Sequence, residues 1–481
     1  MLKMSFPSLT ITKNKLRPEG EFARAQAQFL YPRSEDIKAL NALLQKYRIG
    51  VVSHFYMDAE LQGILSACEY EHIHIADSLL MADRAVQMAE AGVQSIVVLG
   101  VDFMSENVRA VVDAAGYSHI PVYRVDHREI GCSLAESAEA RAYGAWLDQA
   151  KSTSKNPLHV IYINTSLQVK AHAHTKVPTI TCTSSNVVQT ILQADAQISE
   201  LSVWYGPDTY MGQNLTKMFE QFQSHLSDEE IATKIHPQHS RQSIQRLLEN
   251  FHVFPQGNCV VHHMFGLDVV EKVRREYPEA YYTAHLEVPG EMFELAVDAQ
   301  RRGRGVIGST SNILQFILDK VVAARNSTSK VHIPIVLGTE SGMVTSIVRK
   351  VQQKLQELNR EDISVEIIFP VASEAVAQDD TFGILPGVAV GEGCSTAGGC
   401  ATCPYMKMNS LEALENLVEN IGVVLEEGRD IQSLQKFHPQ AYSELLDGKT
   451  IAEVGGEPIL HMRHFQSKGI LPQELVNHVI S

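Results

Sequence analysis

A weak internal repeat is the feature of this sequence that most restricts its fold. Three times along the chain, an apolar strand segment ends in two polar residues at positions i and i+2 and leads into a helix-length segment. The pairs are His54/Tyr56, Tyr162/Asn164 and His285/Glu287. Because residues i and i+2 of a strand face the same side, each pair presents two polar side chains together at the carboxyl end of its strand. Repetition of this unit predicts three copies of one supersecondary structure.

Three further features follow each pair in the same order. A second expected strand ends in hydroxyl residues, which are Ser78, Ser184 and Thr310 in the three copies. A third expected strand ends in glycine and then an acid, which gives Asp102, Asp208 and Glu340. Another helix and strand lead to one cysteine per copy, at Cys132, Cys259 and Cys403. One such feature recurs easily by chance, but their agreement in order favours a threefold repeat.

The alternation of strand and helix segments predicts an α/β protein, with a small parallel-sheet αβα domain in each copy. Ligands of such sheets gather at the carboxyl ends of the strands. We therefore expect three domains, related by a pseudo-threefold axis, around a central cavity. The expected division is a loose N-terminal arm at 1–35, domains at 36–132, 133–260 and 261–405, and a C-terminal helical segment at 406–481 that packs on the first domain.

Composition excludes several classes of protein. The net charge of −15 argues against a nucleic-acid-binding or anionic-membrane surface, and no apolar run approaches the roughly 20 residues of a membrane span. The first residues lack the apolar core of a secretory signal, although their shortage of acids leaves an organellar transit role open. An odd number of cysteines, seven, does not suit a secreted disulfide framework. We expect a cytoplasmic protein.

The cysteines suggest a metal centre. A C-x5-C-x2-C run ends at Cys403 and, taken alone, fits a zinc site, an iron–sulfur fragment or a glycine-rich loop. One cysteine per repeat sharpens this, because three thiolates can hold three irons of a [4Fe–4S] cluster and leave the fourth open as a Lewis acid. Cys394 and Cys400 are then extra, as a redox pair, as neighbours of the cluster or as inert thiols. Cys68, on an expected helix, and Cys182, on an expected strand, are interpreted as buried thiols.

Ten short strings between about residue 50 and about residue 415 resemble one enzyme family. They are SHFYMD, DSLLMA, GVDFMSEN, GCSLAES, YINTSLQVKA, CTSSN, GPDTYMGQN, CVVHHMF, GSTSNIL and CPYMKMNSLEAL. The family is quinolinate synthase A, and the length of the chain resembles its long, plant-type members without their fused sulfur-acceptor domain. The resemblance implies a [4Fe–4S] cluster with one open iron. It also implies condensation of iminoaspartate with dihydroxyacetone phosphate to quinolinate, phosphate and two waters, in NAD biosynthesis.

The resemblance also implies roles for individual residues. The cluster ligands would be Cys132, Cys259 and Cys403. The substrate-binding residues would be His54, Ser78, Tyr162, Asn164, Ser184, His285, Glu287, Ser309 and Thr310, with Tyr56 joining His54 in the HxY pair. For catalysis we favour Glu287 as a general base, its pKa raised by burial near other anions, with Tyr56 and His54 moving a proton at the triose carbonyl.

Other interpretations stay open for several of these residues. The hydroxyl residues could instead cap the helices that follow them, and N-capping is the expected role of Asp102, Asp208 and Glu340. His262 and His263 follow Cys259 and could donate to a cluster sulfide or form a plain polar patch.

The implied partners are the iron–sulfur assembly machinery and an L-aspartate oxidase that supplies the imine, and a homodimer is open. Two rival functions remain: another [4Fe–4S] hydro-lyase, and a non-catalytic iron–sulfur or zinc scaffold.

Overall fold

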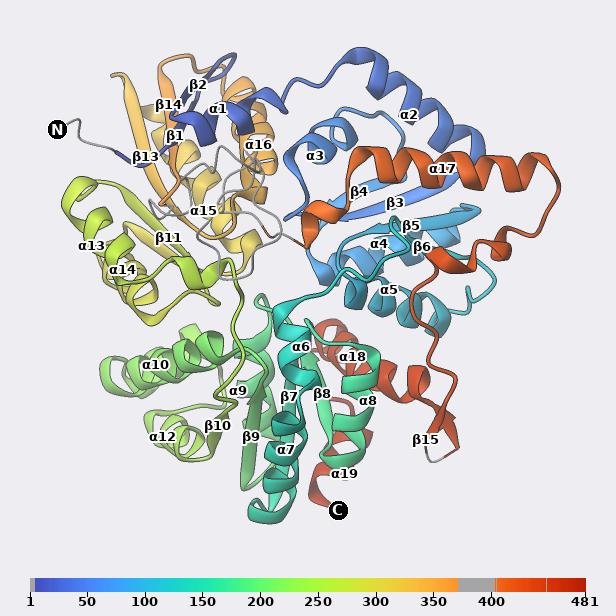
Figure 1. Cartoon of the computed structure of the whole chain (residues 1–481). Helices are drawn as coiled ribbons and strands as arrows, with labels where there is room; N and C mark the ends of the chain where they lie inside the picture. Colours follow the sequence, from blue (N-terminus) through green and yellow to red (C-terminus); the bar gives the residue numbers. More distant parts are fainter. Residues whose placement is uncertain (1–4, 371–402, 404, 447) are drawn as a thin grey trace.

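The computed structural model of the chain describes residues 5–370, 403, 405–446 and 448–481. Cys394 and Cys400 lie outside the described residues. Three lobes surround a common centre, and each is built on its own sheet (Figure 1). The expected α/β architecture of three parallel-sheet domains around a centre is confirmed.

The first domain has four parallel strands in the spatial order β4-β3-β5-β6. The strands are β3 (Ile49–His54), β4 (Ile73–Ala76), β5 (Ser95–Leu99) and β6 (Val122–Arg124). Its helices are α2 (Ser34–Tyr47), α3 (Ala59–Leu65), α4 (Ser78–Glu90) and α5 (Asp102–Ala114). Strand β3 reads IGVVSH and is buried at every position, as expected for a parallel strand covered on both faces.

The second domain repeats this order as β8-β7-β9-β10. The strands are β7 (Asn156–Tyr162), β8 (Thr179–Cys182), β9 (Leu201–Gly206) and β10 (Phe251–Val253). Its helices are α6 (Ser133–Glu139), α7 (Arg141–Thr153), α8 (Leu167–Lys176), α9 (Val187–Gln197), α10 (Thr209–His225), α11 (Asp228–Glu230), η1 (Ile231–Ile235) and α12 (Arg241–Glu249).

The third domain repeats it again as β12-β11-β13-β14. The strands are β11 (Tyr281–His285), β12 (Gly305–Gly308), β13 (Val331–Gly338) and β14 (Ile363–Ile368). Its helices are η2 (His262–Met264), α13 (Leu267–Glu276), α14 (Gly290–Arg301), α15 (Thr310–Ala323), η3 (Ala324–Asn326), η4 (Ser341–Met343) and α16 (Val344–Glu357). In all three sheets the first strand lies between the second and third, so their polar ends are neighbours.

The N-terminal segment is not the loose arm that we expected. It forms β1 (Ser8–Ile11), β2 (Leu16–Glu19) and α1 (Glu21–Gln28). Strand β1 pairs antiparallel with β14, with Leu9 opposite Ile367, and extends the third sheet to six strands. Leu9 and Ile11 are fully buried. The backbone of β1 pairs with what would otherwise be the open edge of β14.

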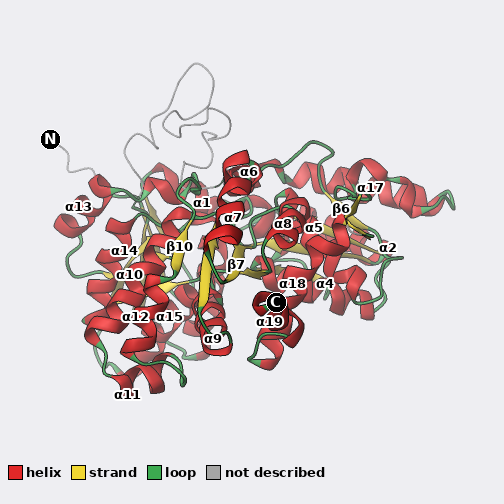
Figure 2. Ribbon diagram, turned by 90° about the horizontal axis from the view of Figure 1, so that it is seen from below, coloured by secondary structure: helices red, strands yellow, loops and turns green. Residues whose placement is uncertain are grey.

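The C-terminal segment packs on two domains rather than on the first alone. It comprises η6 (Met406–Met408), α17 (Leu411–Glu426), η7 (Ile431–Ser433), η8 (Gln435–Phe437), the hairpin β15 (Leu445–Leu446) and β16 (Lys449–Thr450), α18 (Ile451–Lys468) and α19 (Gln473–Ile480). Helix α17 lies along α2, whereas α18 contacts α8 and β8 and α19 contacts β7 (Figures 1 and 2). Within the described residues, no helix has both the length and the apolar character needed to cross a bilayer.

Candidate active site

The carboxyl ends of the three sheets meet at one cavity. Every residue proposed for the site from the sequence lines it: His54, Tyr56, Ser78, Cys132, Tyr162, Asn164, Ser184, Cys259, His285, Glu287, Ser309, Thr310 and Cys403. The lining of the cavity also includes Asp77, His262, Glu340 and Met406. The structure therefore brings together side chains that lie up to about 350 residues apart in sequence, although the four parallel strands of each sheet come from neighbouring segments.

The first domain contributes His54 and Tyr56, where β3 ends. The backbone N–H of Tyr56 donates to His54 Nδ1 at 3.2 Å, so the neutral ring carries its proton on Nε2. Burial lowers the pKa of His54 to about 4 and keeps the ring neutral. The Tyr56 hydroxyl lies 3.1 Å from Thr339 Oγ1 and 3.5 Å from Thr310 Oγ1. Burial, with Glu287 and Glu340 nearby, raises the pKa of Tyr56, which stays a phenol.

The third domain repeats the arrangement at His285 and Glu287, after β11. The Glu287 N–H donates to His285 Nδ1 at 3.3 Å, which again leaves Nε2 as the protonated nitrogen. That nitrogen lies 3.2 Å from Ser184 Oγ of the second domain. Burial lowers the pKa of His285 to about 4. Tyr162, at the end of β7, donates its hydroxyl hydrogen bond to Glu287. These contacts cross the boundary between the second and third domains.

The expectation of a raised pKa for Glu287 is wrong. Burial alone would raise it, but His285 and His262 and the hydrogen bond from Tyr162 outweigh burial and lower the pKa of Glu287 to about 2. The carboxylate is therefore ionised at neutral pH, held by partners from three separate strand ends and loops. Sequence reasoning missed this because two of these partners, His262 and Tyr162, come from other segments of the chain.

Some of the hydroxyl residues at the cavity cap a helix, and others do not. Asp77, not Ser78, caps α4, and its carboxylate accepts from the N–H of Leu80 at 3.0 Å. Ser309 does cap α15, in a capping box with Asn312. Ser78 and Thr310 are the first residues of α4 and α15 and line the cavity. Both helices thus begin at the cavity, where their backbone donors favour an anion.

Each of the three cavity cysteines stands at the start of a helical turn. Burial raises the pKa of Cys132 to about 11, and it raises the pKa values of Cys259 and Cys403 well above the usual value for a thiol. Backbone N–H groups oppose this by donating to the sulfurs: those of Ala135 and Leu134 to Cys132, that of His262 to Cys259, and those of Met406 and Tyr405 to Cys403. Three free, partly buried thiols with N–H donors at one cavity are the donor set that an iron–sulfur cluster requires.

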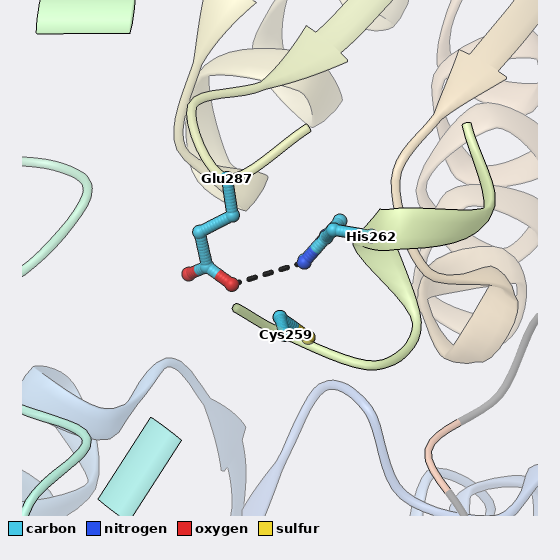
Figure 3. A group of neighbouring side chains, drawn as sticks. All are labelled: Cys259, His262 and Glu287. Atoms are coloured by element: carbon cyan, nitrogen blue, oxygen red, sulfur yellow. Dashed lines mark ion pairs between the residues drawn. The ribbon is translucent and has the colours of Figure 1, made fainter. Parts of the chain in front are cut away.

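His262 takes a larger part in the site than its sequence position indicated. Its Nδ1 lies 2.9 Å from Glu287 Oε2 (Figure 3), and its ring stacks on His285, with the ring centroids 4.9 Å apart. Donor atoms of Cys259, His262 and Glu287 all lie within 4.8 Å of one another, so this trio alone could hold a single metal ion. His263 instead stacks on Tyr210, in a separate surface depression.

The remaining sequence predictions have mixed outcomes. Asp208 caps α10 by accepting from the N–H of Met211, as predicted. The carboxylates of Asp102 and Glu340 instead accept hydrogen bonds from backbone N–H groups in the loops that carry Cys132 and Cys403. Cys182 is buried at the end of β8. Cys68 lies in the loop after α3, not on a helix as expected, and is only partly buried.

Comparisons with known proteins are consistent with this geometry. The family model described as "NadA: Quinolinate synthetase A protein" matches residues 38–436. A chloroplastic quinolinate synthase of Nicotiana tabacum is 52% identical over 99% of this chain and 67% of its own length, and one of Arabidopsis thaliana is 51% identical over 99% and 67%. The quinolinate synthase of Prochlorococcus marinus is 28% identical over 82% of this chain and 87% of its own length. The chain thus spans about two thirds of the length of the plant relatives.

The expected cytoplasmic location is contradicted by these relatives. The plant proteins that match nearly the whole chain are chloroplastic. The cysteine count and the lack of a secretory signal argued only against secretion, and neither distinguishes one compartment inside the cell from another.

Proposed function

We propose a division of labour in the active site of this chain, which belongs to the quinolinate synthase A family of NAD biosynthesis. The reaction is condensation of iminoaspartate with dihydroxyacetone phosphate to quinolinate, phosphate and two waters. The observation that supports it best is the single cavity lined by the polar strand ends and one cysteine from each of the three domains.

Cys132, Cys259 and Cys403 would hold three irons of a [4Fe–4S] cluster. The fourth iron, without a protein ligand, would supply Lewis acidity toward a substrate oxygen. The backbone N–H groups that donate to the three sulfurs favour the thiolate forms that ligation needs.

Substrate binding would depend on neutral donors. Both substrates are anionic, yet none of the described residues that line the cavity is a lysine or arginine. The carboxylates and the phosphate would be bound by the hydroxyls of Ser78, Ser184 and Thr310, by the imidazole N–H groups of His54 and His285, and by the amide of Asn164. The N-termini of α4 and α15 add backbone donors to the same wall.

Proton transfers would depend on one group that is ionised and one that keeps its proton. Glu287 is ionised and can accept a proton before ring closure, while Tyr56 keeps its proton and can donate it at the triose carbonyl. His54 presents Nε2–H beside Tyr56, with the two rings 4.9 Å apart. Tyr162 holds Glu287 in place and, with Asn164, would orient the bound substrate.

An oxygen-free reconstitution tests the proposal. The wild type should contain about four irons and four sulfides per chain and form quinolinate from the two substrates, identified by its mass. Cys259→Ser should bind less iron and lose most of its activity. A reconstituted protein with a full cluster that forms no quinolinate, but dehydrates a hydroxy acid, would favour a hydro-lyase instead.

A zinc scaffold is the alternative function that metal analysis can test. The trio of Cys259, His262 and Glu287 has the mixed sulfur, nitrogen and oxygen donors that zinc accepts. About one zinc per chain, with no sulfide after anaerobic reconstitution, would reject the cluster enzyme.

A further inference from the structure

A polar side chain at the end of the third strand holds the cysteine-bearing loop of the first domain. Asp102 follows β5, and its backbone N–H donates to the carbonyl of Ile130 at 3.0 Å. The N–H of Ile130 in turn donates to Asp102 Oδ2, also at 3.0 Å. Arg124 Nη1 fixes the other carboxylate oxygen at 2.6 Å. Ile130 stands two residues before Cys132, so this reciprocal pair of hydrogen bonds sets the direction in which the chain enters the site.

The second domain has the same pair of hydrogen bonds with a different side chain. Thr209 follows β9, and its N–H donates to the carbonyl of Gly257 at 2.7 Å. The N–H of Gly257 donates to Thr209 Oγ1 at 2.8 Å, and this hydroxyl donates to the carbonyl of Phe254 at 2.9 Å. Gly257 also stands two residues before its cysteine, Cys259. A side chain at Gly257 would meet the carbonyl oxygen of Pro207 at 2.1 Å, so the loop is seated closely.

The third domain achieves the contact with a longer side chain. Glu340 follows β13, and its Oε1 accepts directly from the N–H of Cys403 at 2.6 Å. Glu340 is 2% exposed and Thr209 is 7% exposed, so water does not compete effectively for either contact. All three loops therefore reach the cavity tied to the equivalent strand of their own sheet.

We propose that Asp102, Thr209 and Glu340 are positioning residues that hold the three cysteine loops in the geometry of the metal centre before any metal arrives. This inference rests on the proposed function of the three cysteines. The loops lie outside the sheets, so no strand partner satisfies their backbone N–H groups, and the side chains provide the acceptors instead. Holding three thiols at one point costs chain entropy. Once the thiols are ionised, the thiolates also repel one another. Fixed loops reduce the entropy that metal binding must otherwise overcome.

The test compares isosteric and conservative variants at Thr209. Thr209→Val keeps the shape of the side chain but removes the acceptor for Gly257, whereas Thr209→Ser keeps the hydroxyl. Thr216→Val, on the same helix α10, removes only a hydrogen bond to the carbonyl of Gly212 and is the matched control. In cluster-free, full-length protein, mass spectrometry measures the rate at which iodoacetamide alkylates Cys259. After reconstitution, a chelator challenge measures the half-life of bound iron.

The expected result is a roughly tenfold faster alkylation of Cys259 and a roughly tenfold shorter iron half-life in Thr209→Val, the effect of losing one buried hydrogen bond. Thr209→Ser and Thr216→Val should match the wild type. Glu340→Leu should act in the same way at Cys403, and Glu340→Gln, which keeps an acceptor oxygen, should not. Wild-type rates in Thr209→Val, or equal effects of Val and Ser, would overturn the proposal.

These readouts separate the two proposals. The alkylation rate of cluster-free protein reports how firmly the cysteine loops are held, whether or not quinolinate forms. The expected alkylation rates together with no quinolinate synthesis would reject the proposed function alone. Normal quinolinate synthesis together with unchanged alkylation in Thr209→Val would reject the positioning role alone.

Discussion

The hydroxyl of Tyr162 donates a hydrogen bond to the carboxylate of Glu287 across the boundary between the second and third domains. Burial, with Glu287 beside it, raises the pKa of Tyr162, so the tyrosine stays protonated and acts as the donor. The pair joins the YxN and HxE strand ends into one unit. Its carboxylate is ionised, and it is the group that we propose as the base.

Replacement of either partner should lower turnover by different amounts. We expect Glu287→Gln to reduce kcat by about 10²–10⁴-fold because the amide cannot accept the proton. Tyr162→Phe should reduce kcat by only about tenfold, because the carboxylate remains but loses one of its donors. Steady-state quinolinate formation at matched iron content measures both. Tyr210→Phe, which removes a hydroxyl that contacts only surface-exposed His263, is the control. Near-normal turnover in Glu287→Gln would reject its role as the base.

Gln62 should be essential for the placement of Tyr56. It is fully buried, and its Nε2 lies 2.8 Å from each of the carbonyl oxygens of Phe55, Met57 and Gly342. The amide therefore ties the loop that carries Tyr56 to the third domain. Gln62→Glu, which places a carboxylate oxygen against three carbonyls, should destabilise the protein by roughly 2–4 kcal/mol, more than Gln62→Met. Thermal unfolding of cluster-free protein shows which of the two variants is less stable. Equal melting temperatures for Gln62→Glu and Gln62→Met would contradict the prediction.

The sequence predicted the sheets well because their signal is local. Strands such as β3 and β9 are short apolar runs between turn residues, and the repeated order of strand ends identified which side of each sheet carries the site. It failed at the N-terminus because β1 and β2 are only four residues each, and Pro18 makes the second resemble a loop. β1 pairs with β14, more than 350 residues away, and β2 pairs with β1, and no local pattern reports the pairing with β14.

Residue types at the site were predictable, but their electrostatics were not. The pKa of Glu287 depends on His262 and Tyr162, which reach it from other segments of the chain. Likewise, Asp102 looked like a helix cap because it precedes a helix, whereas its carboxylate is used by Arg124 and Ile130. Spacing identifies candidates, and only the tertiary structure decides between local and long-range partners.

Two adjacent glycines of α18 should respond in opposite ways to the same substitution. A Cβ at Gly455 would meet the carbonyl oxygen of Leu167 at 2.2 Å, whereas one at Gly456 would meet only the Ala110 methyl group at 3.7 Å. Gly455→Ala should therefore destabilise the contact between α18 and α8 by roughly 1–3 kcal/mol. Gly456→Ala should be neutral or stabilising by up to about 1 kcal/mol, because alanine favours the helix. Melting temperatures of the two variants test this, and equal values would contradict the close helix contact.

The stability of the second domain should fall in acid because of one buried histidine. His159 Nδ1 lies 2.8 Å from the carbonyl of Trp204, and its Nε2 lies 3.0 Å from the hydroxyl of Tyr143, which suits a neutral ring. Burial lowers the pKa of His159 to about 4, whereas an unfolded histidine titrates near 6.5. Between these values the unfolded chain binds more protons than the folded one. The free energy of unfolding therefore decreases as the pH is lowered from about 6.5 to about 4.

His159→Gln should remove this contribution. The variant should be less stable than the wild type at pH 7, where the hydrogen bonds of the ring are lost, but the difference should shrink by roughly 2 kcal/mol or more at pH 4.5. The chain contains two tryptophans, Trp146 and Trp204, and both lie in this domain, so their fluorescence during urea unfolding reports it selectively. The other histidines are common to both proteins and cancel in the comparison. A difference between variant and wild type that stays constant from pH 7 to pH 4.5 would show that His159 does not couple protonation to the folding of this domain.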